Sequence, residues 1–237
     1  MPINPAPRAY QIVLQAIEED LRKEKLSVGD QLPGERALAE QHGISRASVR
    51  DAIRILDVMG IIKTSTGSGP NSGAVIISNP SAGISQALRL HLAAKGINVR
   101  EIVESRILLE TWAAQMNPRD PVYAQQVIDR TAVLIMRMDD PQLSREAFHR
   151  IDAEFHVLLA SMAGNSVVES MMESLRNSIS DYVSDSVPSD EAWQPVVRVL
   201  RRQHKAIHHA FATGQRERAA QLLEEHINWF YSQTRSM

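Results

Sequence analysis

The chain of 237 residues contains no cysteine. Disulfide bonds are therefore excluded, and so are metal sites that use thiolate ligands. No apolar run approaches the roughly 20 residues that a membrane-spanning helix needs. Residues 1–8 lack the charged and apolar regions of a secretory signal. These absences lead us to expect a cytoplasmic protein with no membrane partner.

The chain also lacks an excess of positive charge, because its formal net charge is −2 at pH 7. Proteins that bind nucleic acids usually carry a basic surface. The first 78 residues hold nine basic and nine acidic side chains, so that segment is neutral as well. A role in binding DNA must therefore rest on local patterns. With 43% hydrophobic and 23% charged residues, the composition is that of an ordinary globular protein.

Residues 1–78 predict a small domain that ends in a hairpin. Apolar residues recur at helical spacing in three segments, and glycine ends the second and third of them. Two β-prone pieces, 61–64 and 74–77, then flank a tip rich in glycine and serine. Helix, short helix, tight turn, helix and two-stranded wing are the layout of a winged helix-turn-helix DNA-binding domain. Residues 79–83 follow as an expected linker.

Residues 84–237 predict an all-helical domain, which makes the expected fold mainly α. Proline or glycine separates each helical segment from the next, and no segment is a convincing strand. Helices that follow one another through short connections form an antiparallel bundle, whose centre can hold a ligand. The expected helices are 82–95, 99–116, 121–137, 144–163, 166–184, 191–213 and 216–233.

The third helix of the first domain has side chains suited to a major groove. Arg46 and Arg50 lie opposite its buried face, and an arginine can bond guanine in a bidentate manner. The helix N-terminus and its cap residue suit a phosphate. The candidate DNA contacts are Arg36, Ser45, Arg46, Ser48, Arg50, and Thr66 and Gly67 in the wing. The alternative is a solvated face on which Asp51 and Asp57 partly balance the two arginines.

Four polar residues of the second domain fall on apolar faces. Asp152 and His156 lie one helical turn apart, while His204 and His226 sit in the stripes of two later helices. A buried carboxylate needs compensation. Three imidazoles and one carboxylate suit Zn²⁺, with Ni²⁺ as the alternative, and leave positions for an exogenous ligand. A polar core held together by hydrogen bonds, without a metal, remains the other interpretation.

Arg106 shares a helical face with Ile102, Val103 and Leu109, so we expect it to point inward. A guanidinium in that place can hold a ligand carboxylate by two hydrogen bonds. The spacing equally allows an ion pair with Glu110, four residues later.

The order of residues adds a family resemblance. The segment from Leu32 to Ile62 reads LPGERALAEQHGISRASVRDAIRILDVMGII. It resembles, without a gap, the DNA-binding signature of the GntR family of bacterial regulators. The resemblance implies DNA contacts at the arginine and serine candidates above and at the wing tip. The wing sequence GSGPNSG is longer and richer in glycine than in many relatives.

The second domain resembles the FCD (FadR C-terminal) domain of the same regulators. The similar motifs are Asp152-x-x-x-His156, Ala163-Gly164-Asn165, the stretch Gln203–Ile207, and His226. The resemblance implies metal binding through the aspartate and three histidines, with a small organic acid beside the metal. It further implies that Arg106, in the pattern E-x-R-x-x-L-E, meets the acid's carboxylate and that Asn165 lines the effector pocket.

These patterns predict a homodimeric transcription regulator, acting as a repressor, that reads a pseudo-palindromic operator of double-stranded DNA. A carboxylate metabolite would bind the bundle and shift the equilibrium between arrangements of the domains. One rival is a metalloenzyme, but the sequence has no H-E-x-x-H motif and no second inward carboxylate clearly placed as a general base. Another rival is a DNA-binding module whose helical domain only dimerises.

Overall fold

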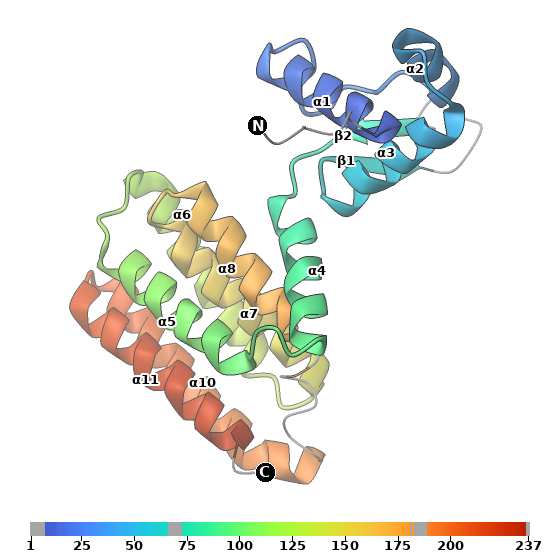
Figure 1. The fold of residues 1–237 in the computed structure, drawn as a ribbon. Coiled ribbons are helices and arrows are strands. Elements are labelled where there is room, and N and C mark those ends of the chain that lie inside the picture. Colours follow the sequence, from blue (N-terminus) through green and yellow to red (C-terminus); the bar gives the residue numbers. More distant parts are fainter. Residues whose placement is uncertain (1–7, 66–72, 181, 183–188, 236–237) are drawn as a thin grey trace, which may run out of the picture. The chain divides into compact units, whose positions relative to one another are not determined.

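The computed structural model describes residues 8–65, 73–180, 182 and 189–235. The chain divides into two compact units, Met1–Ile84 and Ser85–Met237. The ribbon in Figure 1 is coloured along the chain and labels the elements. The predicted boundaries of the two domains and of the linker stay predictions, although α4 (Pro80–Ala93) places residues 80–83 in its first turn.

The first unit consists of three helices and a two-stranded sheet. Helix α3 packs against both other helices and against β1. The strands are antiparallel, with Ile62 opposite Ile76 and Ser65 opposite Gly73. Apolar side chains of all five elements share one core, which includes Val13, Val49 and Leu56. The elements are α1 (Ala9–Arg22), α2 (Glu35–His42), α3 (Arg46–Val58), β1 (Ile62–Ser65) and β2 (Gly73–Ile76).

Local chemistry sets the turn between α2 and α3. Gly43 has a φ of 63°, a left-handed conformation that glycine adopts without steric cost, and it ends α2. Ser45 caps α3, because its side chain accepts a hydrogen bond from the Ser48 backbone N–H at 3.1 Å. At the other end of α3, Gly60 has a φ of 73°, and a Cβ there would lie 2.2 Å from the Asn79 carbonyl oxygen. These residues fix where the exposed face of α3 begins and ends.

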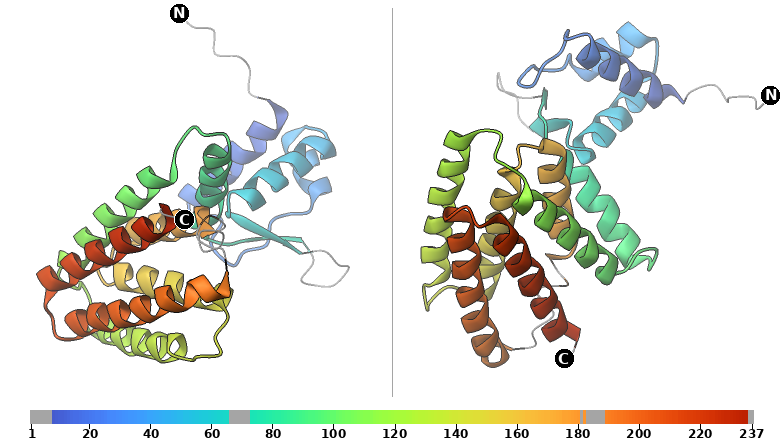
Figure 2. Two further views of the ribbon diagram at one scale, coloured as in Figure 1. Left: turned by 90° about the horizontal axis from the view of Figure 1, so that it is seen from below. Right: turned by 90° about the vertical axis from the view of Figure 1, so that its left-hand side faces the viewer.

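The second unit is a bundle of helices. Each helix lies within a few residues of its predicted range except α8, which ends at Ser178 rather than at residue 184. The ribbon views show α5 running beside α11 along much of its length (Figures 1 and 2), and these two helices are in contact. After α4 the helices are α5 (Val99–Gln115), α6 (Pro121–Met138), α7 (Arg145–Ser161), α8 (Ser166–Ser178), α10 (Asp190–Ala212) and α11 (Arg216–Arg235).

Helix α7 packs inside the bundle against α5, α6 and α8. Its apolar face is buried, with Phe148 and Phe155 among the largest fully buried side chains. Buried apolar residues from α6, α10 and α11 complete the same core. The few buried polar side chains on these helices, such as Asp152 and His204, are therefore held in a closely packed interior.

Candidate metal centre and nucleic-acid interface

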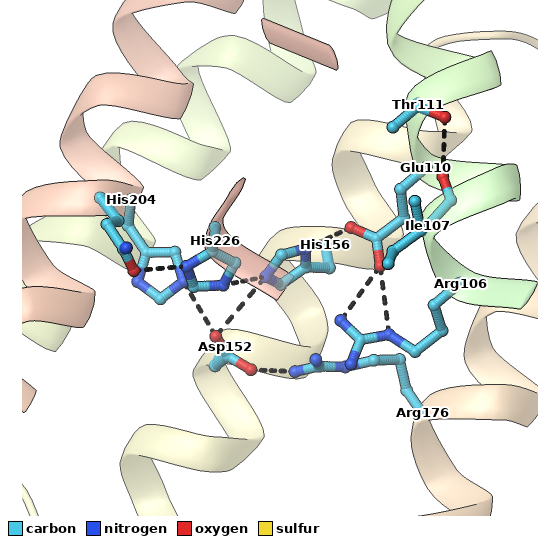
Figure 3. Close-up of polar contacts among 10 residues, drawn as sticks. Arg106, Ile107, Glu110, Thr111, Asp152, His156, Arg176, His204 and His226 are labelled. Atoms are coloured by element: carbon cyan, nitrogen blue, oxygen red, sulfur yellow. Dashed lines mark hydrogen bonds and ion pairs between the residues drawn. The ribbon is translucent and has the colours of Figure 1, made fainter. Parts of the chain in front are cut away.

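The four residues predicted as metal ligands come together in the bundle. Asp152 and His156 lie on α7, His204 on α10 and His226 on α11. Figure 3 shows their side chains pointing toward one another, and one ligand atom from each lies within 4.8 Å of the other three. All four residues are buried, His156 and His204 completely. Three helices thus place one carboxylate and three imidazoles around a common point.

The contacts within this cluster leave donor atoms without partners. The Asp152 Oδ1 atom is 2.9 Å from His204 Nε2 and 3.6 Å from His156 Nε2. The His204 Nε2 contact with Asp152 is close but lacks hydrogen-bond geometry, and within the described residues the buried His204 Nδ1 atom has no hydrogen bond either. A buried polar atom without a partner is costly. The structure therefore leaves unsatisfied polar atoms at the point where a cation would supply their partner.

Hydrogen bonds to the Nδ1 atoms of His156 and His226 determine that Nε2 of each ring faces the cluster. The His156 Nδ1 atom is 2.5 Å from Glu110 Oε2, and the His226 Nδ1 atom is 2.9 Å from Gln203 Oε1. Each Nδ1–H donates to its oxygen, so the lone pair of a neutral ring lies on Nε2. The two Nε2 atoms are 3.2 Å apart. Two lone pairs cannot face each other at that distance, so a proton or a metal ion must lie between them.

The charges around the cluster shift the pKa values of its two carboxylates. Burial alone would raise the pKa of Asp152, but Arg176 and the neighbouring histidines hold it well below the usual range. Burial also opposes ionisation of Glu110, yet His156 and Arg106 lower its pKa to about 2. Both groups are therefore carboxylates at neutral pH. Asp152 faces the cluster, and Glu110 contacts the far nitrogen of the His156 ring.

The three histidines differ in their affinity for a proton. Burial lowers the pKa of His204 and, aided by the nearby imidazoles, puts that of His226 well below its ordinary value. Burial has the same effect on His156, but the charges of Glu110 and Asp152 outweigh it and raise its pKa. Of the three rings, His156 is thus the one whose neighbouring carboxylates favour the protonated form. The donor set fits a divalent transition metal, which prefers imidazole and carboxylate ligands.

A cavity adjoins the cluster and is lined by Arg106, Asp152, Arg176 and His226, together with His149. The predicted inward direction of Arg106 agrees with its burial, since its side chain is 5% exposed. Its Nε and Nη2 atoms donate to Glu110 Oε1 at 3.2 and 3.1 Å. The ion pair and the inward orientation, treated as alternatives from the sequence, are therefore both present. Burial, followed by repulsion from Arg176, lowers the pKa of Arg106 to about 10, and it stays charged.

Asn165 is not among the residues that line this cavity. Its side chain caps α8 instead, accepting hydrogen bonds from the backbone N–H groups of Val167 and Val168 at 3.1 and 3.3 Å. An amide oxygen engaged in this way satisfies two of the helix's free N–H groups. This geometry gives Asn165 a capping role and leaves its predicted contact with an effector without support.

The candidate DNA contacts of the first unit lie at the exposed start of α3 and on α2. The side chains of Arg46 and Arg50 are 63% and 49% exposed. Arg50 donates to Glu35 through Nε and Nη2 at 3.2 and 2.9 Å, and Arg46 lies 3.8 Å from the same carboxylate. Arg36, on α2, is also exposed. Thr66 and Gly67, the wing candidates, lie outside the described residues.

Four residues that contact the candidate site residues were not predicted to do so, apart from the pairing of Glu110 with Arg106. Glu35 and Arg176 were not considered, Gln203 was named only as part of a family motif, and Glu110 was considered only as a partner of Arg106. Glu110 is a second inward carboxylate, whereas the expectation concerned only a carboxylate placed as a general base. Its position was detectable, because it follows the buried residues Ile102, Val103 and Arg106 along one face of α5. It is nevertheless occupied by His156 and Arg106, which leaves no oxygen free to act as a base.

Two family matches divide the chain as the two units do. Residues 9–70 match the gntR family of bacterial regulatory proteins, and residues 101–228 match the FCD domain. The chain belongs to the GntR family and carries an FCD domain. The resemblance stated from the sequence is thereby confirmed.

Relatives of this GntR-family protein are transcriptional regulators rather than enzymes. The Uxu operon regulator of Haemophilus influenzae is 27% identical over 171 residues, which are 70% of this chain and 58% of the relative. The transcriptional repressor NanR of Citrobacter rodentium is 26% identical over 92% of this chain and 82% of its own length. A solved structure, Streptococcus agalactiae GntR, covers 97% of this chain and all of its own, with a TM-score of 0.60 and 21% identity.

These findings confirm the predicted fold, a winged helix-turn-helix followed by a helical bundle. The first relative is matched over less than two thirds of its length. Among the residues that the structure describes, no helix is both long enough and apolar enough to span a bilayer.

Proposed function

We propose that this GntR-family protein is a sequence-specific, DNA-binding transcription regulator. Its affinity for an operator would depend on a small carboxylate that binds beside a metal ion. The observation that carries the proposal is the convergence of four buried donor atoms in a chain that also has a winged helix-turn-helix. A domain that served only for dimerisation would have no need of such a cluster, because an apolar core is at least as stable.

The DNA half of the proposal rests on the exposed start of α3. Arg46 and Arg50 would contact base edges in the major groove, where the arginine fork matches guanine. Glu35 accepts a hydrogen bond from Arg50 and would orient its guanidinium before DNA arrives. The backbone would be held by phosphate contacts, which fix the register of the protein on the duplex. The proposed phosphate and wing contacts are Arg36, Ser45, Ser48, Thr66 and Gly67.

The metal half rests on the chemistry of the donor set. Asp152, His156, His204 and His226 would hold Zn²⁺, with Ni²⁺ as the alternative. Such an ion supplies a Lewis acid that can bind a carboxylate oxygen. Glu110 and Gln203 keep two of the rings in the tautomer that presents Nε2. Outer hydrogen bonds of this kind orient metal ligands in proteins.

The effector would enter the cavity beside this cluster and pair with Arg106. Two protomers would read the two halves of a pseudo-palindromic operator, as helix-turn-helix dimers do. The effector must bind one arrangement of the domains better than the other, because only differential affinity shifts an equilibrium. We place the protein in the cytoplasm, where the operator is, and expect repression, the activity printed in the name of its relative NanR.

One experiment with two pairs of variants tests both halves. Binding of protein to fragments of its own upstream DNA is measured by fluorescence anisotropy, and metal content by elemental analysis of protein purified without chelators. Arg46→Ala should abolish the preference for operator DNA, while its matched control Arg54→Ala, an exposed arginine on the same helix, should retain it. Unchanged specificity in Arg46→Ala would refute the assignment of α3.

His204→Ala should lose the metal and the response to carboxylates but keep its affinity for DNA. Its matched control is His209→Ala, because His209 is exposed on the same helix. If His204→Ala retained as much metal as the control, the four residues would not be the ligands.

A further inference from the structure

Arg176 on α8 has no part in the function proposed so far, yet it adjoins the metal cluster. Its Nη2 atom donates to Asp152 Oδ2, the oxygen that faces away from His204 (Figure 3). Its side chain is only 10% exposed. An arginine is almost never buried to this extent unless its charge is matched. Asp152 supplies this matching charge, and it places the Arg176 guanidinium beside the metal cluster.

Arg176 and Arg106 line the same cavity from two different helices. Figure 3 shows the two guanidinium groups next to each other, and their mutual repulsion contributes to the lowered pKa of Arg106. Asp152 is the one carboxylate among the described residues that line this cavity. Much of the remaining lining is apolar and includes Val103 and Phe230. Such a site attracts an anion with a short hydrocarbon body.

The balance of charge indicates how many negative groups that anion carries. Among the arginines and carboxylates alone, Asp152 and Glu110 match the charges of Arg176 and Arg106. A divalent ion bound by neutral histidines would leave two positive charges in the interior without a counter-charge. Buried charge that lacks compensation is unfavourable by several kcal/mol. A ligand with one carboxylate restores only half of the balance.

We propose that the effector is a dicarboxylate. One carboxylate lies beside the metal and Arg106, and the second pairs with Arg176. This inference rests on the proposed function, since it concerns the same cavity. It makes Arg176 the residue that distinguishes a dicarboxylate from a monocarboxylate, because the planar guanidinium matches a carboxylate by two parallel hydrogen bonds.

The competing explanation is that Arg176 only positions Asp152 for the metal. The two roles predict different results. A residue that positions a metal ligand affects every acid equally and changes the metal content. A residue that receives the second carboxylate affects dicarboxylates alone and leaves the metal in place.

The test compares acids of equal size on zinc-loaded protein by isothermal titration calorimetry. Succinate is paired with succinamate, in which an amide replaces one carboxylate, and malonate and glutarate are paired with their monoamides. We expect the best diacid to bind about tenfold more tightly than its monoamide, the effect of one charge-assisted contact. Equal affinity for diacid and monoamide in every pair would overturn the inference, and this comparison needs no variant.

Arg176→Gln should reduce the preference for the diacid to about one, with zinc content unchanged. The matched control is Arg150→Gln, an exposed arginine on α7 that lines the surface hollows outside this cavity. Loss of zinc from Arg176→Gln, or equal weakening of diacid and monoamide, would overturn the inference in favour of the positioning role. If acids bind without preference for two carboxylates, only this inference fails. If no acid binds zinc-loaded protein, the proposed function fails with it.

Discussion

Replacing Glu110 by Gln should weaken zinc binding without touching any proposed ligand. In the structure, Glu110 Oε2 lies 2.5 Å from His156 Nδ1 and Oε1 accepts two bonds from Arg106. The carboxylate thus holds the His156 ring with Nε2 toward the cluster and compensates a buried guanidinium. Glutamine has the same size and can still accept a hydrogen bond, but it has no charge. The variant therefore isolates the electrostatic part of the interaction.

The expected magnitude follows from the position of Glu110. Loss of an outer hydrogen-bond partner of a metal ligand usually costs about 10- to 100-fold in metal affinity, which corresponds to roughly 1.4–2.7 kcal/mol. We expect a value near the upper end, because the Glu110 side chain is only 2% exposed and water cannot replace the lost charge. The imidazole also becomes a weaker base when its partner is neutral.

The assay is competition for zinc between the protein and a fluorescent chelator at pH 7.5. The control variant is Glu154→Gln, because Glu154 is a half-exposed carboxylate on α7 whose nearest cation, Arg130, is 3.6 Å away. Tryptophan fluorescence verifies the fold, since all three tryptophans of the chain lie in the second unit. A zinc affinity of Glu110→Gln within about twofold of the unaltered protein would refute the role of the outer carboxylate. So would an equal loss in the control.

Two further predictions concern His149 and Glu35. Burial lowers the pKa of His149 to about 4, so the folded protein binds this proton less readily than the unfolded chain, whose ordinary value is near 6.5. The contribution of neutral His149 to the free energy of unfolding is thus complete above pH 6.5, and it is lost as the pH falls toward 4. Between pH 7.5 and 5 the loss is about 2 kcal/mol for metal-free protein. In urea denaturation, the free energy of unfolding of His149→Gln should decline over this pH range by about 2 kcal/mol less than that of the unaltered protein. Equal declines in the two proteins would contradict the prediction. Glu35→Gln should raise affinity for non-specific DNA and lower the preference for the operator by about two- to fivefold, the worth of an exposed ion pair. Anisotropy titrations on both DNAs measure this, and an unchanged preference would show that Glu35 does not orient Arg50.

Helical periodicity was sufficient to predict the bundle and the four proposed ligands. Apolar residues on α7 recur every three or four positions, so a carboxylate such as Asp152 within that stripe has to face the core. The same reasoning placed His204 and His226 inside, and all of them are buried. The end of α8 was placed too far along the chain, because residues 179–184 continue a helical pattern without a strong stop signal.

The partners of these ligands were harder to predict, because they depend on contacts between helices. Arg176 lies beside the buried stripe of α8, but nothing in its spacing shows that it meets Asp152 on α7. Gln203 precedes His204 on α10 and yet bonds His226 on α11. Asn165 was assigned to the pocket by resemblance, whereas its position directly before α8 favours a cap. Periodicity in a single sequence predicts the buried face of each helix, but it does not show which of these faces contact one another.

The cluster connects five helices of the second unit through ionisable or polar side chains. Helices α7, α10 and α11 carry the proposed ligands, whereas α5 and α8 carry Arg106 and Arg176. A ligand that contacts both the metal and the two arginines would therefore bind most tightly to one spacing of these two groups of helices. Differential affinity of this kind is what a ligand needs in order to shift a conformational equilibrium. A monocarboxylate bound at the metal alone would make no contact with α8. The charge balance of the cavity and the requirement for a conformational signal thus favour the same class of effector.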